Sequence, residues 1–195
     1  MEALLFVTSS DGKFREAASI WKGPLERVVL DLPEIQAATI EEIARAKGKE
    51  AFARLNRPCV VEDAGLELSA WGGLPGAYVK WFEHTGLEVL CRALDGFEDR
   101  SAFAVSVLCR TDSSGETIVT GRLAGRIAPR PAGEGGFGWD AIFIPGGHDR
   151  TFAQMSAQEK DAISHRRKAW EALAERIHPT RGERAGSGLP ETKLS

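Results

Sequence analysis

Long apolar runs are missing from the 195-residue sequence, and none reaches the ~18 residues that a membrane-spanning helix needs. The first residues, Met1 to Leu4, also lack the basic stretch ahead of an apolar segment that marks a secretory signal. We therefore expect no signal peptide and no membrane partner. A basic excess is missing too, because 25 Lys and Arg face 28 Asp and Glu and leave a net charge of −3. Since a dedicated nucleic-acid binder needs a basic surface to displace counterions, we expect no nucleic-acid partner.

Cysteine is scarce, and several catalytic signatures are absent. Cys59, Cys91 and Cys109 are odd in number and widely spaced, which predicts reduced core thiols in a cytoplasmic protein rather than disulfides or a zinc site. The sequence has no His-Glu-x-x-His, no Gly-x-Ser-x-Gly and no Gly-x-x-x-x-Gly-Lys-Ser/Thr. It therefore gives no support to a zinc hydrolase, a serine hydrolase or a P-loop enzyme.

The composition that is present is that of an ordinary globular protein. Hydrophobic residues make up 43% and charged residues 27%, which at this length is typical of one folded domain. Gly, Arg, Pro, Glu and Ser dominate the last residues, where the periodic pattern stops. We expect one domain over residues 1–178 and a disordered tail over residues 179–195.

Alternating apolar runs and amphipathic stripes predict an α/β fold. The apolar run at 4–7 predicts a buried strand, and Phe14, Ala17, Ala18 and Trp21 then recur at helical spacing. The other expected elements are strands at 28–32 and 59–61, a helix capped by Thr39 and ending near Asn56, a short helix at 87–94, a hairpin of 102–110 with 117–124, and a strand at 142–144.

The turn from Thr8 to Lys13 is the first group able to carry chemistry. It places hydroxyls, backbone N–H groups and one ammonium at the N-terminus of the expected helix, an arrangement that suits phosphate. An ordinary turn with a surface lysine is the alternative.

Glu62 and Asp63 are expected at the carboxyl end of the strand at 59–61. Acids in that position are typical of a Mg²⁺ site, because Mg²⁺ takes one or two carboxylates together with phosphate oxygens. A solvated strand end is the alternative. Since strand side chains alternate between faces, only one of the pair points into a given cleft unless the strand has already ended.

Residues 133–138 formally match Gly-x-Gly-x-x-Gly, but a strand-like stretch follows them instead of a helix. The dinucleotide fingerprint needs the helix, so we reject that interpretation. A loop that presents Phe137 and Trp139 to a base fits the pattern, and so do core aromatics at a bulge.

The last cluster of donor side chains, a cationic patch, consists of Lys160 with Ser164, His165, Arg166, Arg167 and Lys168. It is either a binding patch or a solvated helix face. Ser156 offers a capping box for one long helix, while Ser164 offers a second cap, so the zone contains one helix or two.

Eight segments, taken together and in order, resemble the inosine triphosphate pyrophosphatase family, also called XTP/dITP diphosphatases. They are Phe-Val-Thr-Ser-Ser-Asp-Gly-Lys (6–13), Leu-Pro-Glu-Ile-Gln (32–36), Val-Glu-Asp-Ala-Gly-Leu (61–66), Gly-Gly-Leu-Pro-Gly-Ala-Tyr-Val-Lys-Trp-Phe (72–82), Gly-Phe-Glu-Asp-Arg-Ser-Ala (96–102), Phe-Gly-Trp-Asp (137–140), Thr-Phe-Ala-Gln-Met (151–155) and Glu-Lys-Asp-Ala-Ile-Ser-His-Arg (159–166). The resemblance implies an elongated mixed central sheet flanked by helices, with two lobes around a deep nucleotide cleft, in a homodimer.

The resemblance also implies Mg²⁺-dependent hydrolysis of ITP, dITP or XTP to the monophosphate and pyrophosphate, which clears deaminated purines from the nucleotide pool. The matching positions carry these roles: Thr8, Ser9, Ser10, Asp11, Gly12 and Lys13 hold the triphosphate; Glu34 and Asp63 bind Mg²⁺; Lys47 and Lys80 contact phosphate; Phe137, Gly138, Trp139 and Asp140 line the base and sugar pocket; and Lys160, His165 and Arg166 close around the base. The same resemblance implies that Asp63 also orients or deprotonates the attacking water and that Lys13 is catalytic.

Base selection follows from hydrogen-bonding chemistry. Hypoxanthine and xanthine carry an acceptor oxygen at C6, where adenine carries a donor. A pocket with donors from Lys160, His165 or Arg166 leaves a donor unpaired opposite adenine, at a cost of ~1–3 kcal/mol. The sequence assigns no residue to the C2 side of the base, where guanine has to be rejected.

Three positions depart from the family pattern. Ser10 stands where Asn is usual, Ala64 where Ser or Thr is usual, and Ala141 where Pro is common. The first two fall in the phosphate and metal region. They leave open the same chemistry on a different or modified nucleoside triphosphate, and a nucleotide-binding protein without catalysis.

Overall fold

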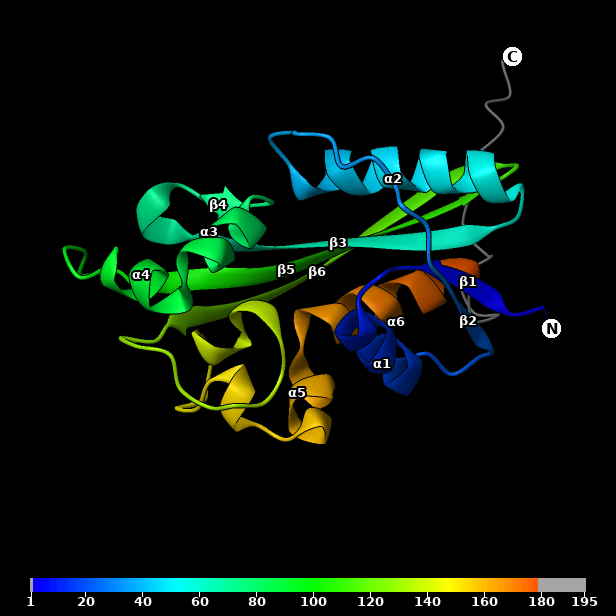
Figure 1. Cartoon of the computed structure of the whole chain (residues 1–195). Coiled ribbons are helices and arrows are strands. Elements are labelled where there is room, and N and C mark those ends of the chain that lie inside the picture. Colours follow the sequence, from blue (N-terminus) through cyan, green and yellow to red (C-terminus); the bar gives the residue numbers. More distant parts are fainter. Residues whose placement is uncertain (1, 179–195) are drawn as a thin grey trace, which may run out of the picture.

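The computed structural model describes residues 2–178 as a long mixed sheet with helices on both faces (Figure 1). The predicted tail at 179–195 lies outside the described residues. The strands are β1 (Leu4–Val7), β2 (Leu25–Val28), β3 (Cys59–Leu68), β4 (Pro75–Gly76), β5 (Ser101–Asp112), β6 (Gly115–Ile127) and β7 (Phe143–Pro145). Their order is β2-β1-β3-β5-β6-β7, with β4 paired to β3. Because β1 runs parallel to β2 and β3 while the other pairs are antiparallel, the predicted mixed sheet is confirmed.

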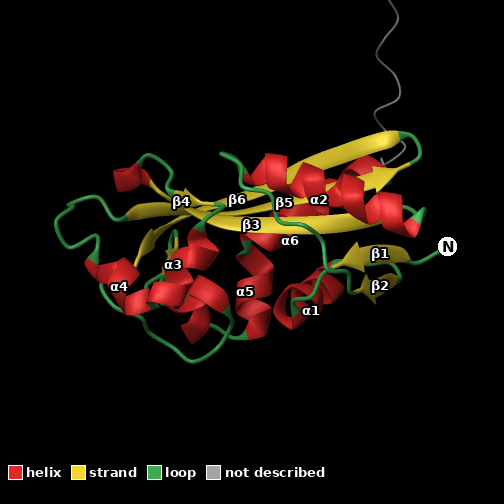
Figure 2. Cartoon of the chain, turned by 45° about the horizontal axis from the view of Figure 1, so that its top comes forward, coloured by secondary structure: helices red, strands yellow, loops and turns green. Residues whose placement is uncertain are grey.

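The helices are α1 (Asp11–Ile20), α2 (Ile40–Leu55), α3 (Val79–Thr85), α4 (Leu87–Arg92), α5 (Ala157–Ile163) and α6 (His165–Ile177). Figure 2 shows α2 on one face of the sheet and α1, α5 and α6 on the other, with α3 and α4 toward one end. The capping box of Thr39 and Glu42 begins α2 as predicted, and Asn56 ends it in the left-handed conformation. Ser164 takes an extended backbone and caps α6, so the C-terminal zone is two helices.

The side chains of β3 alternate between two buried layers. Cys59 and Val61 pack in the cluster that includes α2, whereas Val60 packs against α1 and α6 in the opposite cluster. A third cluster fills the other end of the sheet. Continuing this alternation, residue 62 points toward α6 and residue 63 toward α2. All three cysteines are buried free thiols, as predicted.

The bounds of two expected strands differ most from the prediction. The second covers Leu25–Val28 and not 28–32. Its last ladder bond runs from the Thr8 amide to the Val28 carbonyl, and beyond it β1 turns into α1, so residues 29–32 have no strand to pair with. The helix α3 was missed because its seven residues carry no side-chain cap at Tyr78.

The third strand is longer than expected, which corrects the placement of Glu62 and Asp63 at its end. They lie mid-strand, because β5 pairs with β3 over its whole length. On the other edge, β1 covers only Cys59–Val61, and β4 covers only Leu66 and Glu67. Within the described structure, residues 62–65 of β3 therefore have no strand beside them on the edge opposite β5.

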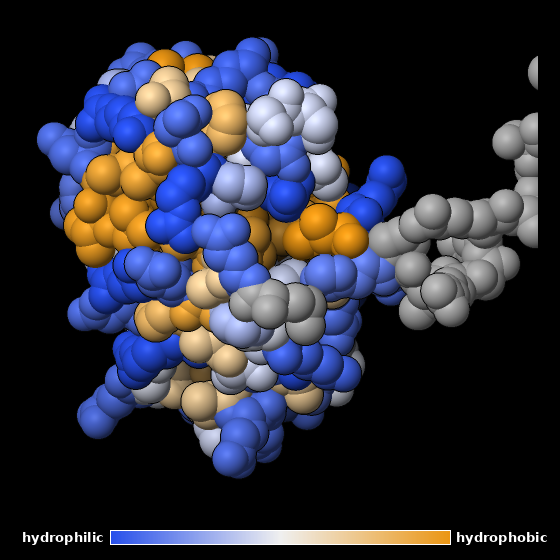
Figure 3. Space-filling model, turned by 90° about the vertical axis from the view of Figure 1, so that its right-hand side faces the viewer, coloured by the Kyte–Doolittle hydropathy of each residue, from blue (hydrophilic) through white to orange (hydrophobic). Residues whose placement is uncertain are grey.

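The surface agrees with the absence of long apolar runs. Among residues 2–178, none of the helices combines the length and apolar character that crossing a bilayer would require. Seen from the end that carries the N-terminus, apolar side chains gather in separate patches between hydrophilic ones (Figure 3).

Gly121 on β6 gives a test of how α6 is seated. A Cβ atom there would lie 2.0 Å from the His165 carbonyl oxygen and 2.4 Å from the Ala169 amide nitrogen, both backbone atoms of α6. We expect Gly121→Ala to lower the free energy of unfolding by about 3 kcal/mol, because the helix must move off the sheet. Urea denaturation measures this. Gly96→Ala, at a position with open space, is the control, and an equal effect of both substitutions would contradict the close packing.

Candidate functional site

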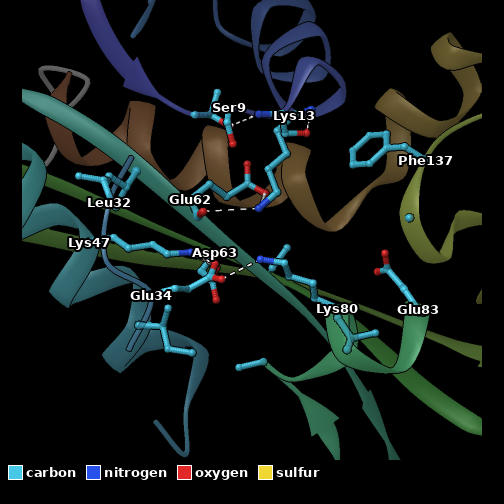
Figure 4. A pocket seen from close by; sticks show the side chains of 18 of the residues that line it. Ser9, Lys13, Leu32, Glu34, Lys47, Glu62, Asp63, Lys80, Glu83 and Phe137 are labelled. Carbon is cyan, nitrogen blue, oxygen red and sulfur yellow. Dashed lines mark hydrogen bonds and ion pairs between the residues drawn. The ribbon is translucent and has the colours of Figure 1, made fainter. Parts of the chain in front are cut away.

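A cavity of about 580 Å³ opens at the unpaired edge of β3. Side chains from both layers reach it, together with the β1–α1 turn, the segment after β2, α3 and the loop ahead of β7 (Figure 4). The predicted site residues that line it are Thr8, Ser9, Ser10, Lys13, Glu34, Lys47, Asp63, Lys80, Phe137, Gly138, Trp139, Asp140, Lys160, His165 and Arg166. Segments far apart in the sequence thus meet in one cavity.

The β1–α1 turn is organised by its own hydroxyls. Thr8 Oγ1 accepts from the Ser10 amide at 3.1 Å, and Ser10 Oγ accepts from the Lys13 amide at 3.2 Å, which caps α1. Serine and asparagine are both strong helix caps, so Ser10 keeps this structural role despite departing from the family pattern. The capped helix start directs Lys13 into the cavity.

Asp11 and Gly12 do not line the cavity. Asp11 is exposed and pairs with Arg27. Gly12 is buried beneath the Phe137 ring, since a Cβ atom there would come within 2.5 Å of it. Its role in the described structure is to let Phe137 pack on the helix start.

Glu34 and Asp63 meet on the α2 side of the cavity. The Lys47 ammonium donates to Glu34 Oε1 at 2.7 Å and to Asp63 Oδ1 at 2.8 Å, and Lys80 donates to Glu34 Oε2 at 2.8 Å. These two lysines lower the pKa of Glu34 to about 2. Burial alone would lower the pKa of Lys47, but the Asp63 and Glu34 carboxylates outweigh it and raise that pKa. The two carboxylates therefore face a shared cation, the Lys47 ammonium.

The pair has the donor chemistry of a Mg²⁺ site, although not of a closed one. Among residues 2–178, no group of three or more His, Cys, Asp or Glu is placed to hold a metal ion. Mg²⁺ is commonly held by one or two carboxylates, with phosphate and water completing its octahedron. Glu34 and Asp63 fit a site that phosphate and water complete. They do not fit a site whose ligands all come from the protein.

Glu62 occupies the opposite face of β3. Its buried carboxylate accepts from Arg166 Nη2 at 2.7 Å and lies 3.8 Å from the Lys13 ammonium. Burial would raise the pKa of Glu62, but Arg166 and Lys13 outweigh this and hold it below its usual range. Glu62 thus fixes two cations that border the cavity.

The ion network of Glu62 and Arg166 continues to the far end of the cavity through the partly buried Glu16. Lys160 pairs with Asp140 and, at 2.7 Å, with Glu16, which also pairs with Arg166. Asp140 in turn accepts from the Phe137 amide at 2.8 Å and fixes the loop. Glu16 was not predicted, although it follows Lys13 by one helical turn and so shares its face.

His165 differs from its charged neighbours. It is 1% exposed, and within the described structure neither ring nitrogen has a hydrogen-bond partner. Burial, together with the positive charges of Arg166 and Lys160, holds the pKa of His165 well below its usual range. The neutral ring lies beside Trp139, with 5.2 Å between ring centroids, and offers one donor and one acceptor.

The sequence left open whether Phe137 and Trp139 are presented to a base or packed in the core, and the structure places them differently. Phe137 is half-buried, and its ring centroid lies 4.7 Å from the Lys160 ammonium. Trp139 is 7% exposed and belongs to the core, though one side of it borders the cavity. Glu83 also lines the cavity and was missed, although its spacing from Lys80 places both on one face of α3.

Glu62→Gln tests the buried pair. The substitution removes one of the two negative charges that pair with the buried Arg166 guanidinium and leaves only Glu16. We therefore expect the free energy of unfolding to fall by about 3 kcal/mol. Glu50→Gln, which removes the exposed i,i+4 pair with Arg54, is the control and should change it by less than about 1 kcal/mol. Denaturant titration measures the free energy of unfolding of both variants. An equal decrease in the two would refute a structural role for Glu62.

Comparisons with known proteins agree with this geometry. The Ham1 family matches residues 4–176 of the chain. The dITP/XTP pyrophosphatase of Methanopyrus kandleri is 43% identical over 177 residues, which cover 88% of this chain and 94% of the relative. Inosine triphosphate pyrophosphatase 2 of Trypanosoma cruzi is 45% identical over 172 residues, covering 86% and 88%. The Ham1 protein structure from Staphylococcus aureus has a TM-score of 0.78 at 29% identity and covers 90% of this chain and 98% of its own. The resemblance seen in the sequence is confirmed, and the chain belongs to the Ham1 family.

Proposed function

We propose that the protein is a Mg²⁺-dependent pyrophosphatase that hydrolyses ITP, dITP or XTP to the monophosphate and pyrophosphate and so clears deaminated purines. One observation carries the proposal: a single cavity has lysines and paired carboxylates at one end and, at the other, a buried, neutral His165 whose ring nitrogens have no hydrogen-bond partner among the described residues. Relatives named dITP/XTP pyrophosphatase and inosine triphosphate pyrophosphatase support the same activity.

The lysine and carboxylate end suits the triphosphate. Lys13, Lys47 and Lys80 supply three ammonium groups around the edge of β3, and the capped start of α1 adds backbone donors. Glu34 and Asp63 would hold Mg²⁺, which when bound neutralises charge on the phosphates and on the leaving pyrophosphate. In this structure the Lys47 ammonium bridges the Glu34 and Asp63 carboxylates. With Mg²⁺ bound to those carboxylates, the same ammonium would be close enough to pair with a phosphate oxygen.

Hydrolysis needs a water molecule directed at the α-phosphorus. The water oxygen forms a bond to that phosphorus while the bond to the α–β bridging oxygen breaks, and pyrophosphate leaves. Asp63 orients the water and accepts its proton, because its carboxylate shares Lys47 with Glu34 at the lysine-lined end of the cavity, whereas Glu62 is held by Arg166. Lys13 donates to the phosphate oxygens on which charge develops.

The opposite end suits a keto-bearing purine. Phe137 offers a ring face, and His165 can donate to the oxygen at C6. Lys160 and Arg166 beside it are donors only, so the amino group of adenine would face donors. A buried donor left unpaired costs ~1–3 kcal/mol, which disfavours ATP.

A substrate panel tests the function. We expect Mg²⁺-dependent release of pyrophosphate from ITP, dITP and XTP, with kcat/KM at least ~10-fold higher than for ATP, because adenine presents an amino group to the donors that suit a C6 oxygen. GTP is expected to be a similarly poor substrate through its C2 amino group, since guanine carries the same C6 oxygen. Pyrophosphate is measured with and without Mg²⁺. Equal turnover of the common and the deaminated nucleotides would refute the specificity. A preference for a modified nucleotide would favour the alternative substrate, and tight ITP binding without turnover would favour a binding protein.

Asp63→Asn tests the reaction. The amide cannot accept the proton from water and binds a metal ion poorly, so we expect kcat to fall at least ~100-fold while the melting temperature changes little. Asp95→Asn, at an exposed position outside the cavity, is the matched control. Activity of Asp63→Asn close to that of the control would remove Asp63 from the mechanism.

We further propose that the protein works as a cytoplasmic homodimer. The three free, buried thiols support a reducing compartment. Large apolar side chains exposed near α3 and α4, namely Leu74, Trp81, Val89 and Phe97, supply surface that a second copy would cover.

A further inference from the structure

Glu83 is a carboxylate in the cavity for which the reaction described above has no use. It lies on α3, one helical turn after Lys80, and is half-buried. Its Oε1 atom would lie 3.3 Å from a Cβ atom placed on Gly138, so the carboxylate reaches across the cavity to the loop ahead of β7. Figure 4 shows it on the side of Lys80 that faces Phe137.

A carboxylate in a nucleotide cleft can pair with a cation, bind a metal ion or accept from a neutral donor. Within the described structure, Glu83 forms no ion pair, whereas Glu16, Glu34, Glu62 and Asp140 each form at least one. It is also not grouped with Glu34 and Asp63 as a third metal-binding acid. The remaining role is that of an acceptor for a donor that the ligand brings.

The position of Glu83 identifies that donor. Lys80 marks the triphosphate end of the cavity, and Phe137 with His165 marks the base end. A nucleotide that spans both ends places its sugar between them, where Glu83 lies. The sugar is neutral and carries hydroxyl donors, so it can approach a carboxylate without the charge repulsion that a phosphate would meet.

The electrostatics of the site agree with an acceptor that still needs a partner. Burial raises the pKa of Glu83 and the Asp140 carboxylate adds to this, which together outweigh His84, Lys13 and Lys80. Hydroxyl donors from a ligand would stabilise the ionised form.

We propose that Glu83 accepts hydrogen bonds from the ribose hydroxyl groups of the bound nucleotide and so sets the preference of the protein for the sugar. The inference rests on the proposed function, because it uses the same orientation of the nucleotide in the cavity.

The test compares ITP with 2′,3′-dideoxy-ITP, which keeps the base and the triphosphate but lacks both hydroxyls. For the wild type we expect a higher kcat/KM for ITP. Glu83→Leu should lower kcat/KM for ITP about 10- to 100-fold, as expected for loss of a hydrogen bond to a charged group, and change that for the dideoxy nucleotide less than about twofold. For Glu83→Gln, which keeps one acceptor oxygen, kcat/KM for ITP should lie between the values for the wild type and Glu83→Leu.

Glu88→Leu, at an exposed position on α4, is the control and should leave both substrates unchanged. Melting temperatures show whether each variant is folded. If Glu83→Leu does not fold, Glu83→Gln serves as the test. An equal loss for both nucleotides, or an unchanged preference for ITP, would overturn the sugar contact while leaving the proposed function intact. A wild type that hydrolyses no deaminated nucleotide would overturn the proposed function and this inference with it.

Discussion

The unpaired edge of β3 at residues 62–65 is the constraint on which the site depends. Strand side chains alternate, so Glu62 and Asp63 belong to opposite layers of the protein. They reach one cavity because β1 ends at Val7, opposite Val61, and β4 pairs with β3 only from Leu66 onward, which leaves both faces open from the side. Had β1 continued, its backbone would fill this space.

The cavity wall is built mainly from charges that compensate one another. Arg166 with Glu62, and Lys160 with Asp140 and Glu16, are buried networks in which each ion has a partner. Such pairs are held rigidly, because separating one leaves an uncompensated buried charge. Within the part of the chain that the structure describes, the His165 ring nitrogens have no hydrogen-bond partner and Glu83 forms no ion pair, so both can bond to a ligand. Both are suited to reading the neutral parts of a nucleotide.

This division gives the nucleotide a direction. Lysines and the carboxylates of Glu34 and Asp63 surround one end of the cavity, whereas the other end is lined by Phe137 and His165. A polyanion is favoured where the ammonium groups gather, and a flat uncharged ring is favoured beside the aromatic side chains. In the proposed binding mode, phosphate chemistry and base selection are therefore separated along one cleft.

The sequence by itself determined the local features. The caps at Thr39, Ser156 and Ser164, the strand at 4–7 and the hairpin of β5 and β6 depend on short-range propensity and periodicity, and the ordered motifs identified the family. The tertiary structure decided the rest. The end of β2, the length of β3 and the pairing of Glu16 with Lys160 and Arg166 depend on which strand or helix lies alongside, and residues 144 to 150 positions apart carry no local signal of contact. Within the described residues, the lack of a hydrogen-bond partner for the His165 ring and of an ion pair for Glu83 was likewise fixed only by what the fold places around them.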